Sequence, residues 1–304
     1  MMNLDIAAAE IIGTRAEQQD ASAIVRLGES GDAVLLVLAD GLGGHADGAK
    51  AARIVVETFR ERALGGAFAQ AELSRRALDE AIIETNTRIR SARDPADGER
   101  GVASTAVAAI IAEGHLKWVS VGDSHLYVWR RGQIAKLNAD HSQAGMMIRD
   151  GRAPDDPAVL AASSLLASAL SGHAIEEIDS PTAVVPLASG DVVLLASDGL
   201  DVLSSAEIAQ IIEESSEVDA AALTRALIAT VEGFRLPRQD NATVVAARLL
   251  GAGLPANPED ALPGGVIRPG SYSHNAGGKT GWPLAVGLAV LAAILASVIV
   301  TQIP

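Results

Sequence analysis

The sequence predicts an α/β protein built as a layered α-β-β-α sandwich, in which two mainly antiparallel sheets are flanked by helices. Two runs of strand-forming aliphatic residues, 34–39 and 192–197, each lead into Asp-Gly and have the length of buried strands. Several short β-like runs are joined by Gly-containing connections of hairpin length, which favour antiparallel pairing. Helical patterns come in pairs between these runs, so a layered sandwich fits better than a doubly wound parallel sheet.

The remaining elements follow from periodicity and from chain breakers. Apolar residues at helical spacing, and the breakers after them, predict helices over 46–64, 70–93, 205–214 and 218–233. Short β-like runs predict strands over 104–111, 115–121, 126–129, 133–137 and 242–246. The segment 140–180 is less regular, and we expect it to form a mobile flap over a site.

The chain divides into a folded domain, a linker and an apolar tail. Residues 1–250 are expected to form the domain, and the Gly-, Pro-, Asn- and Ser-rich residues 251–281 read as a flexible linker. From Trp282 to Val300 there is no charged residue, and about 20 such residues suffice to cross a bilayer. The alternative is a buried core helix, but such a helix usually has a polar face. We therefore predict that residues 282–304 are a transmembrane tail anchor.

Basic residues and composition suggest where the domain lies. Arg268 and Lys279 precede the apolar tail, which favours a cytoplasmic domain held at the cell inner membrane. The net charge of −14 argues against nucleic acid as a partner, because phosphate backbones recruit Lys and Arg. There is no Cys, which excludes disulfides, a thiolate nucleophile and zinc-thiolate sites.

Acidic residues stand at the ends of the predicted strands. Asp40 and Asp198 follow two aliphatic runs, and Asp240 lies just before the strand that begins at Ala242. Carboxylates at the mouths of buried strands are unfavourable unless a cation or hydrogen bonds compensate them. Several of them converging on one point would bind a hard divalent metal ion.

An ordered set of short motifs carries a family resemblance. The motifs are Arg15–Asp20, Val37–His45, Val121–Ser124, Leu137–Ser142, Ala196–Leu200 and Asp240–Val244. In this order they resemble the metal-dependent protein phosphatases, the phosphatase 2C-like family, in its bacterial serine/threonine form. The resemblance spans about residues 10–249.

The resemblance implies a role for each matching residue. Asp20, Asp40, Asp198 and Asp240 match the carboxylates that hold two Mn²⁺ or Mg²⁺ ions, and Gly41 matches the residue that lends its carbonyl oxygen. Asp123 matches a carboxylate of a third, weaker metal site, and Arg15 matches the arginine that grips the substrate phosphate. Oxygen ligands suit these ions, and a guanidinium suits phosphate.

The resemblance also implies a reaction. Two such ions about 4 Å apart can share a water, lower its pKa and direct it at phosphorus. We expect in-line hydrolysis of phosphoserine or phosphothreonine without a covalent enzyme intermediate. Phosphoproteins, with a Ser/Thr kinase and its substrates, are the expected partners in signalling.

Several positions depart from the family pattern. Gln18 and Gln19 replace the usual Asn and Glu, and Gln19 could still order a metal-bound water by hydrogen bonding. His125 replaces the Arg that usually follows Gly-Asp-Ser, and Leu42 stands where some relatives have a His. The segment 166–172 lacks the Arg of its counterpart.

Several of these residues also have simpler interpretations. Asp123 could simply cap a turn, Arg15 could form a surface ion pair, and His45 and His141 are acid–base candidates or packing residues. The segment 41–46 fits a loose dinucleotide fingerprint, but no acidic residue follows a second strand about 20 residues later. No Gly-x-Ser-x-Gly motif of a serine hydrolase occurs. A silent phosphatase-like module that binds phosphoproteins remains the alternative function.

Overall fold

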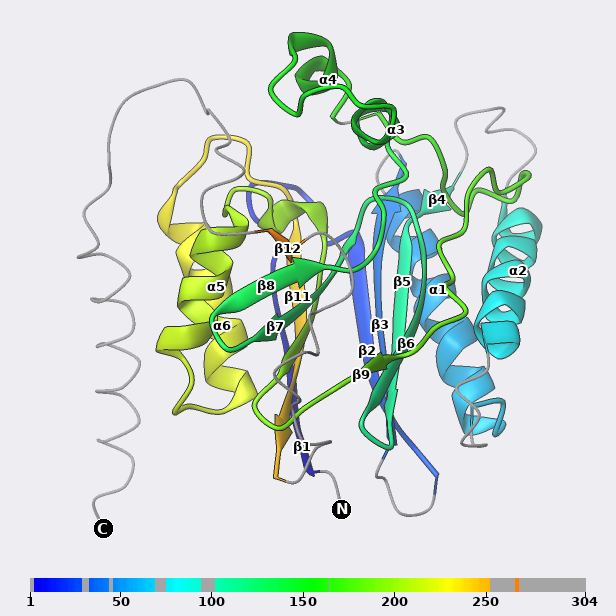
Figure 1. Ribbon diagram of the computed structural model, residues 1–304. Coiled ribbons are helices and arrows are strands. Elements are labelled where there is room, and N and C mark those ends of the chain that lie inside the picture. Colours follow the sequence, from blue (N-terminus) through cyan, green and yellow to red (C-terminus); the bar gives the residue numbers. More distant parts are fainter. Residues whose placement is uncertain are drawn as a thin grey trace.

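Two antiparallel sheets lie face to face between two pairs of helices. The computed structural model describes residues 3–28, 33–43, 46–68, 75–93, 102–163, 165–251 and 266–267. Figure 1 shows helices α1 and α2 outside one sheet and helices α5 and α6 outside the other. The predicted α-β-β-α sandwich of antiparallel sheets is confirmed.

The first sheet has the strand order β1-β11-β10-β7-β8-β12. Its strands are β1 (Asn3–Ile11), β7 (His125–Arg130), β8 (Gln133–Lys136), β10 (Val192–Ala196), β11 (Ala242–Leu250) and β12 (Val266–Ile267). Each neighbouring strand pair in this order is antiparallel.

The second sheet has the order β2-β3-β5-β6-β9, with β4 paired to β3. Its strands are β2 (Asp20–Leu27), β3 (Ala33–Leu42), β4 (Ala103–Ser104), β5 (Ala106–Ala112), β6 (His115–Val121) and β9 (Val185–Pro186). These pairs are antiparallel as well.

The helices cover the outer faces and form the flap. The covering helices are α1 (Ala46–Leu64), α2 (Arg75–Ala92), α5 (Ser205–Glu214) and α6 (Ala220–Gly233). Two short helices, α3 (Gln143–Arg149) and α4 (Pro157–Ala161), build the flap, which lies beyond one end of the sandwich (Figure 1). A 3₁₀ turn, η2 (Asp198–Leu200), follows β10. Helix α5 begins at a capping box in which Ser204 and Glu207 satisfy each other's backbone N–H groups.

Alternation along β3 shows how the layers are held together. Leu35 and Val37 belong to the core that packs against α1 and α2, whereas Leu36 and Leu38 belong to the core between the sheets. Successive strand side chains point to opposite faces, so an uninterrupted aliphatic run serves both layers at once. A third core, which includes Leu194 of β10, packs against α5 and α6.

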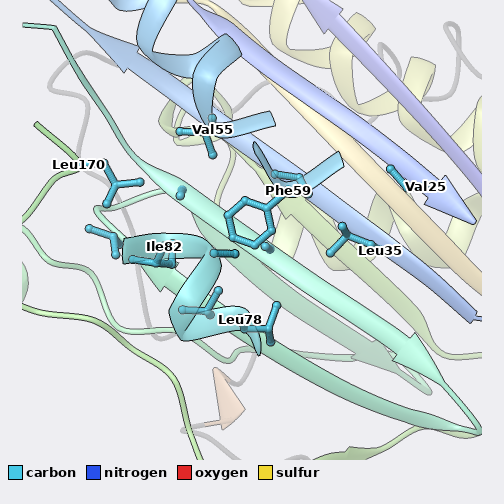
Figure 2. Packing of buried hydrophobic residues seen from close by; sticks show 14 of the residues in the cluster. Val25, Leu35, Val55, Phe59, Leu78, Ile82 and Leu170 are labelled. Atoms are coloured by element: carbon cyan, nitrogen blue, oxygen red, sulfur yellow. The ribbon is translucent and has the colours of Figure 1, made fainter. Parts of the chain in front are cut away.

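Phe59 is the largest side chain with full burial in the core beside α1 and α2. Figure 2 shows its ring among Leu35, Val55, Leu78 and Ile82, and it is 0% exposed. Its ring centroid lies 6.4 Å from that of Phe68 in a stacked pair. It therefore joins two helices and a sheet through one side chain.

Most predicted elements coincide with observed ones, and the differences have physical reasons. The predictions for α1, α5 and β6 match the observed bounds, and the flap contains two short helices. The strands β1 and β2 were not predicted, because many of their side chains are half-buried or exposed and form no continuous apolar run. The described part of α2 begins at Arg75, and residues 70–74 of that prediction lie outside the described residues.

The structure describes only a small part of the predicted linker and none of the predicted anchor. Residues 266–267, within the predicted linker, form β12 against Ala135 and Ile134 of β8. No helix among the described residues is both long and apolar enough to cross a membrane. The predicted anchor at 282–304 lies outside the described residues, so it stays a prediction.

Replacing Phe59 should test the joint between helices and sheet. We expect Phe59→Ala to lower the free energy of unfolding by about 3–5 kcal/mol, because it removes a buried ring and leaves a cavity. Ile83 on α2 is 58% exposed, so Ile83→Ala should change it by less than about 0.5 kcal/mol. Urea unfolding of both variants measures these changes. Equal losses of unfolding free energy in the two variants would contradict the role of Phe59 in joining the helices to the sheet.

Candidate active site

The two sheets bring five predicted carboxylates together at one end of the sandwich. Asp20 opens β2 and stands directly across from Asp40 near the end of β3. In the other sheet, Asp198 follows β10, and Asp240 precedes the adjacent strand β11. Asp123 lies in the turn between β6 and β7, which joins one sheet to the other. Side chains far apart in the sequence thus meet where the sheets end.

The glycines after Asp40 and Asp198 allow the backbone to pack closely against a neighbouring segment. A Cβ atom on Gly41 would lie 2.0 Å from the carbonyl oxygen of Gly48, and one on Gly199 would lie 1.9 Å from that of Asn241. Neither position could carry a side chain without moving the backbone. The Asp-Gly pattern therefore marks packing of the chain against a neighbouring segment as well as a turn.

Asp20 is held in place by a serine that the sequence did not reveal as important. The Oγ of buried Ser197 donates a 2.7 Å hydrogen bond to Asp20 Oδ2. The backbone N–H of Thr243 donates to the same Ser197 Oγ at 2.9 Å. Because that oxygen already accepts this bond, its own proton is directed to the carboxylate, which fixes the orientation of Asp20.

Thr105 joins the segments that carry Asp40 and Asp123. Its Oγ1 accepts a hydrogen bond from the backbone N–H of Asp40 at 2.9 Å and pairs with Ser124 Oγ at 2.7 Å. Its own N–H donates to the carbonyl oxygen of Asp40 at 2.8 Å. The two acidic segments are therefore positioned by one buried residue between them.

Asn241 ties the N-terminal loop to β11. Its Nδ2 donates to the carbonyl oxygens of Ile12 and Glu17, at 2.9 and 3.0 Å, and its Oδ1 accepts the N–H of Gln19 at 2.8 Å. This loop carries Arg15, whose guanidinium forms an ion pair with Asp240. Arg15 thus stands beside the carboxylate cluster, with its side chain 55% exposed.

The shared location raises the pKa of Asp40 and of Asp198. Burial, followed by the charges of Asp198, Asp20, Asp123 and Asp240, raises the pKa of Asp40 well above its ordinary value. Burial and the neighbouring acids Asp123, Asp201 and Asp240 raise the pKa of Asp198 to about 7. Without a cation, carboxylates this close to one another cannot all ionise at little cost.

Burial also raises the pKa of Asp20 and of Asp123. The pKa of Asp20 is raised by burial, although the hydrogen bond from Ser197 opposes this. The pKa of Asp123 is raised by burial against the opposing charge of His125. The cluster therefore has an excess of negative charge that a bound cation would relieve.

The donor set fits Mn²⁺ or Mg²⁺. Among the described residues, no three His, Asp or Glu side chains alone form a finished metal site. The available donors are oxygens, which suit Mn²⁺ and Mg²⁺ better than soft metals.

His125, one of the departures from the family pattern, is buried beside Asp123 and contacts several polar side chains. Its Nε2 lies 2.7 Å from Asp201 Oδ1, and its Nδ1 lies 2.6 Å from Lys136 Nζ. Burial and the Lys136 charge lower the pKa of His125, but Asp201 and Asp140 outweigh them and leave it raised. Lys136 also forms an ion pair with Asp140. These groups satisfy one another at the base of the flap.

Of the two histidine candidates, His141 has a position that indicates a structural role. It is fully buried, and its Nδ1 accepts the N–H of Gly122 at 3.2 Å. Its carbonyl oxygen accepts the N–H groups of Ala167 and Ser168 in the flap. Burial lowers the pKa of His141, and its Nε2 is 3.8 Å from Glu177 Oε1. His45 lies outside the described residues.

The glutamines of the first motif order the backbone near Asp20. Gln18 Nε2 donates to the carbonyl oxygen of Ile11 at 3.2 Å, and its Oε1 accepts the N–H of Asp20 at 3.1 Å. Gln19 lies against Gly48, where an added Cβ would come 3.0 Å from the Gln19 side-chain carbonyl carbon. Gln18 thus supports the loop, and the predicted water-ordering role of Gln19 stays a prediction.

Comparison with known proteins identifies the family. A family model described as protein phosphatase 2C matches residues 10–232. The chain belongs to the protein phosphatase 2C family. The family predicted from the ordered motifs is therefore confirmed.

Curated relatives of this family carry the same enzyme name. The chain is 30% identical over 226 residues to the serine/threonine protein phosphatase PstP of Mycobacterium tuberculosis, covering 70% of this chain and 40% of that protein. It is 30% identical over 185 residues to the serine/threonine phosphatase stp of Listeria innocua, covering 59% of this chain and 71% of that protein. The predicted enzyme class agrees with these names. The chain spans less than half the length of PstP.

Solved structures of the family share the fold. The crystal structure of M. tuberculosis PstP/Ppp superposes with a TM-score of 0.69 at 29% identity, covering 83% of this chain and 100% of that one. A second PstP catalytic-domain structure, with a TM-score of 0.67 and 29% identity over 83% of this chain and 100% of that one, is in complex with 2 manganese ions. The predicted pair of Mn²⁺ or Mg²⁺ ions agrees with that complex.

The raised pKa of Asp198 predicts how stability changes with pH when metal is removed. A carboxyl whose pKa is raised from 3.8 to about 7 on folding stabilises the fold at low pH and loses this contribution as pH rises through about 7. In EDTA, we expect Tm to fall as the pH rises from about 4 to about 7, and Mn²⁺ to restore it at the higher pH. The fall should be smaller for Asp198→Asn, whose amide does not titrate. Parallel curves of Tm against pH for the wild type and Asp198→Asn would contradict the raised pKa of Asp198.

Proposed function

We propose that the chain hydrolyses phosphoserine and phosphothreonine in proteins, using Mn²⁺ or Mg²⁺. The observation that supports this most directly is the meeting of Asp20, Asp123, Asp198 and Asp240 around Asp40. Two bound ions would supply an activated water and would neutralise charge on the phosphate. The family match supports the same reaction class.

The protein residues would position the reacting groups. Asp20, Asp40, Asp198 and Asp240, with the carbonyl oxygen of Gly41, would hold the two ions, and Asp123 would contribute to a third. Ser197 and Thr105 would act as positioning residues, because they fix Asp20 and the Asp40 backbone. In-line attack at phosphorus then needs no covalent link to the enzyme.

Arg15 would bind the substrate phosphate. Its guanidinium is more than half exposed and lies beside Asp240, so it can reach a phosphate placed at the cluster. The planar fork of N–H donors matches two phosphate oxygens. The ion pair with Asp240 would keep this side chain near the site between turnovers.

We further propose that the domain, residues 1–250, works at the membrane. Residues 282–304 would form a tail anchor in the cell inner membrane, and residues 251–281 would link it to a cytoplasmic domain. Such a tether raises the local concentration of the enzyme near membrane-bound phosphoproteins. A Ser/Thr kinase and its substrates would be the partners.

Replacing a central carboxylate should remove activity without unfolding the protein. We expect Asp198→Asn and Asp40→Asn to reduce Mn²⁺-dependent phosphate release from a phosphothreonine peptide by more than about 100-fold, because each removes an ion ligand. EDTA should do the same to the wild type. Asp155→Asn, on the exposed surface of the flap, is the matched control. No release by folded wild type with either metal would favour the silent binding module.

Removing the Arg15 side chain should weaken substrate binding more than turnover. We expect Arg15→Ala to raise KM for the phosphopeptide by about tenfold or more, because charged hydrogen bonds to phosphate are lost. Calorimetric Mn²⁺ affinity should not fall, since the substitution removes a cation from beside Asp240. Arg76→Ala, an exposed position on α2, should change neither quantity. An unchanged KM would refute the phosphate role.

Deleting the apolar tail should release the protein from membranes. We expect the full chain to sediment with the membrane fraction and a chain ending at Gly281 to remain in the supernatant with full activity. The physical reason is that the deletion removes the stretch of about 20 uncharged residues that would span the bilayer. Sedimentation of the shortened chain with membranes would rule out the anchor.

A further inference from the structure

A cavity of about 370 Å³ lies between the flap and the sandwich, next to the carboxylate cluster. The flap helices α3 and α4, strands β7 and β8, and the turn that leads into α5 all contribute to its lining. Asp123 lies in its wall and also acts on the pKa of Asp40. A ligand in this cavity would therefore lie on the same side of the sandwich as a substrate phosphate at the cluster, with Asp123 shared by both sites.

The charged groups at the floor of the cavity are already paired with one another. His125 Nε2 lies 2.7 Å from Asp201 Oδ1, and Lys136 contacts both His125 and Asp140. The carboxylates of Asp140 and Asp201 thus lie against two basic side chains, Lys136 and His125. Arg149 also lines the cavity and forms an ion pair with Glu177, so these paired groups do not require an ionic ligand.

Much of the rest of the lining is apolar and belongs largely to the flap. Ile148, Val159 and Leu160 come from α3 and α4, and Leu203 comes from the turn before α5. Leu160 is 48% exposed, although large aliphatic side chains usually gain free energy from burial. Contact with an aliphatic or aromatic group would bury this apolar wall and would therefore be favourable in free energy.

We propose that this cavity receives an apolar side chain of the substrate, close in sequence to its phosphorylated residue. This proposal rests on the proposed function, because it takes the phosphate to lie at the carboxylate cluster. An extended chain advances about 3.3 Å per residue, so a side chain within about three residues of the phosphate can reach past Asp123. The preferred substrates would then carry a residue such as Leu or Phe near the phosphothreonine.

The test compares phosphothreonine heptapeptides that differ at one position. A background of Gly and Ser receives Leu, in turn, at each of the three positions on either side of the phosphothreonine, and a parallel set receives Arg. The full chain, in detergent with Mn²⁺, is assayed on each peptide and on p-nitrophenyl phosphate. We expect kcat/KM to rise about tenfold over the background peptide for Leu at one or two positions.

Three variants locate the preference on the protein. Leu160→Ser removes an apolar wall, and Ser163→Phe narrows the cavity at another lining residue, so each should bring the Leu-to-background ratio close to one. Leu165→Ser is the matched control, because Leu165 is 47% exposed on the same flap and does not line the cavity. Its ratio should equal that of the wild type.

The outcomes separate this proposal from the proposed function. Hydrolysis of p-nitrophenyl phosphate without a Leu preference at any position would overturn the cavity proposal and leave the phosphatase intact. A preference that survives both cavity variants, or a preference for Arg instead of Leu, would also overturn it. No hydrolysis of any substrate would refute the proposed function, and this inference with it.

Discussion

The repulsion among carboxylates gathered at the end of two packed sheets is the constraint on which the rest of the site depends. Burial raises the pKa of Asp40, and the charges of four other acids around it add to this effect. Such an arrangement is stable only if protons, hydrogen bonds or cations compensate the charge. Ser197, Thr105 and Asn241 supply bonds that fix the geometry, but they bring no positive charge. The fold thus builds a place where a divalent cation is the natural complement.

The sandwich explains why this site needs both sheets. The pairing of Asp20 with Asp40 comes from the register of β2 and β3, whereas Asp198 and Asp240 come from neighbouring strands in the other sheet. The central core, with Leu36 and Leu38 on one side, keeps the two sheets at a fixed separation. Packing far from the cluster therefore sets the distances within it.

The sequence revealed those parts of the molecule whose signals are local. An aliphatic run that ends in Asp-Gly is visible because one strand must serve two cores and because Gly41 and Gly199 have no room for a Cβ atom. The ordered motifs then identified the family and the acidic residues. Ser197 was not recognised, because its partner Asp20 is 177 positions away and a lone Ser carries no signal. The strands β1 and β2 were missed, since their side chains are too mixed in exposure to form an apolar run. The cavity under the flap depends on tertiary packing that no local pattern encodes.

The pairing of β12 with β8 bears on where the chain can safely be shortened. Strand β8 would otherwise be the last strand of its sheet, and residues 266–267 cover Ile134 and Ala135. A protein ended directly after β11 would lose this cover and leave backbone donors and acceptors of β8 open to solvent. Open strand edges of this kind recruit other strands, including those of a second copy. A shortened enzyme that dimerises or precipitates could therefore do so because of its new sheet edge, and not because its catalytic domain is unstable.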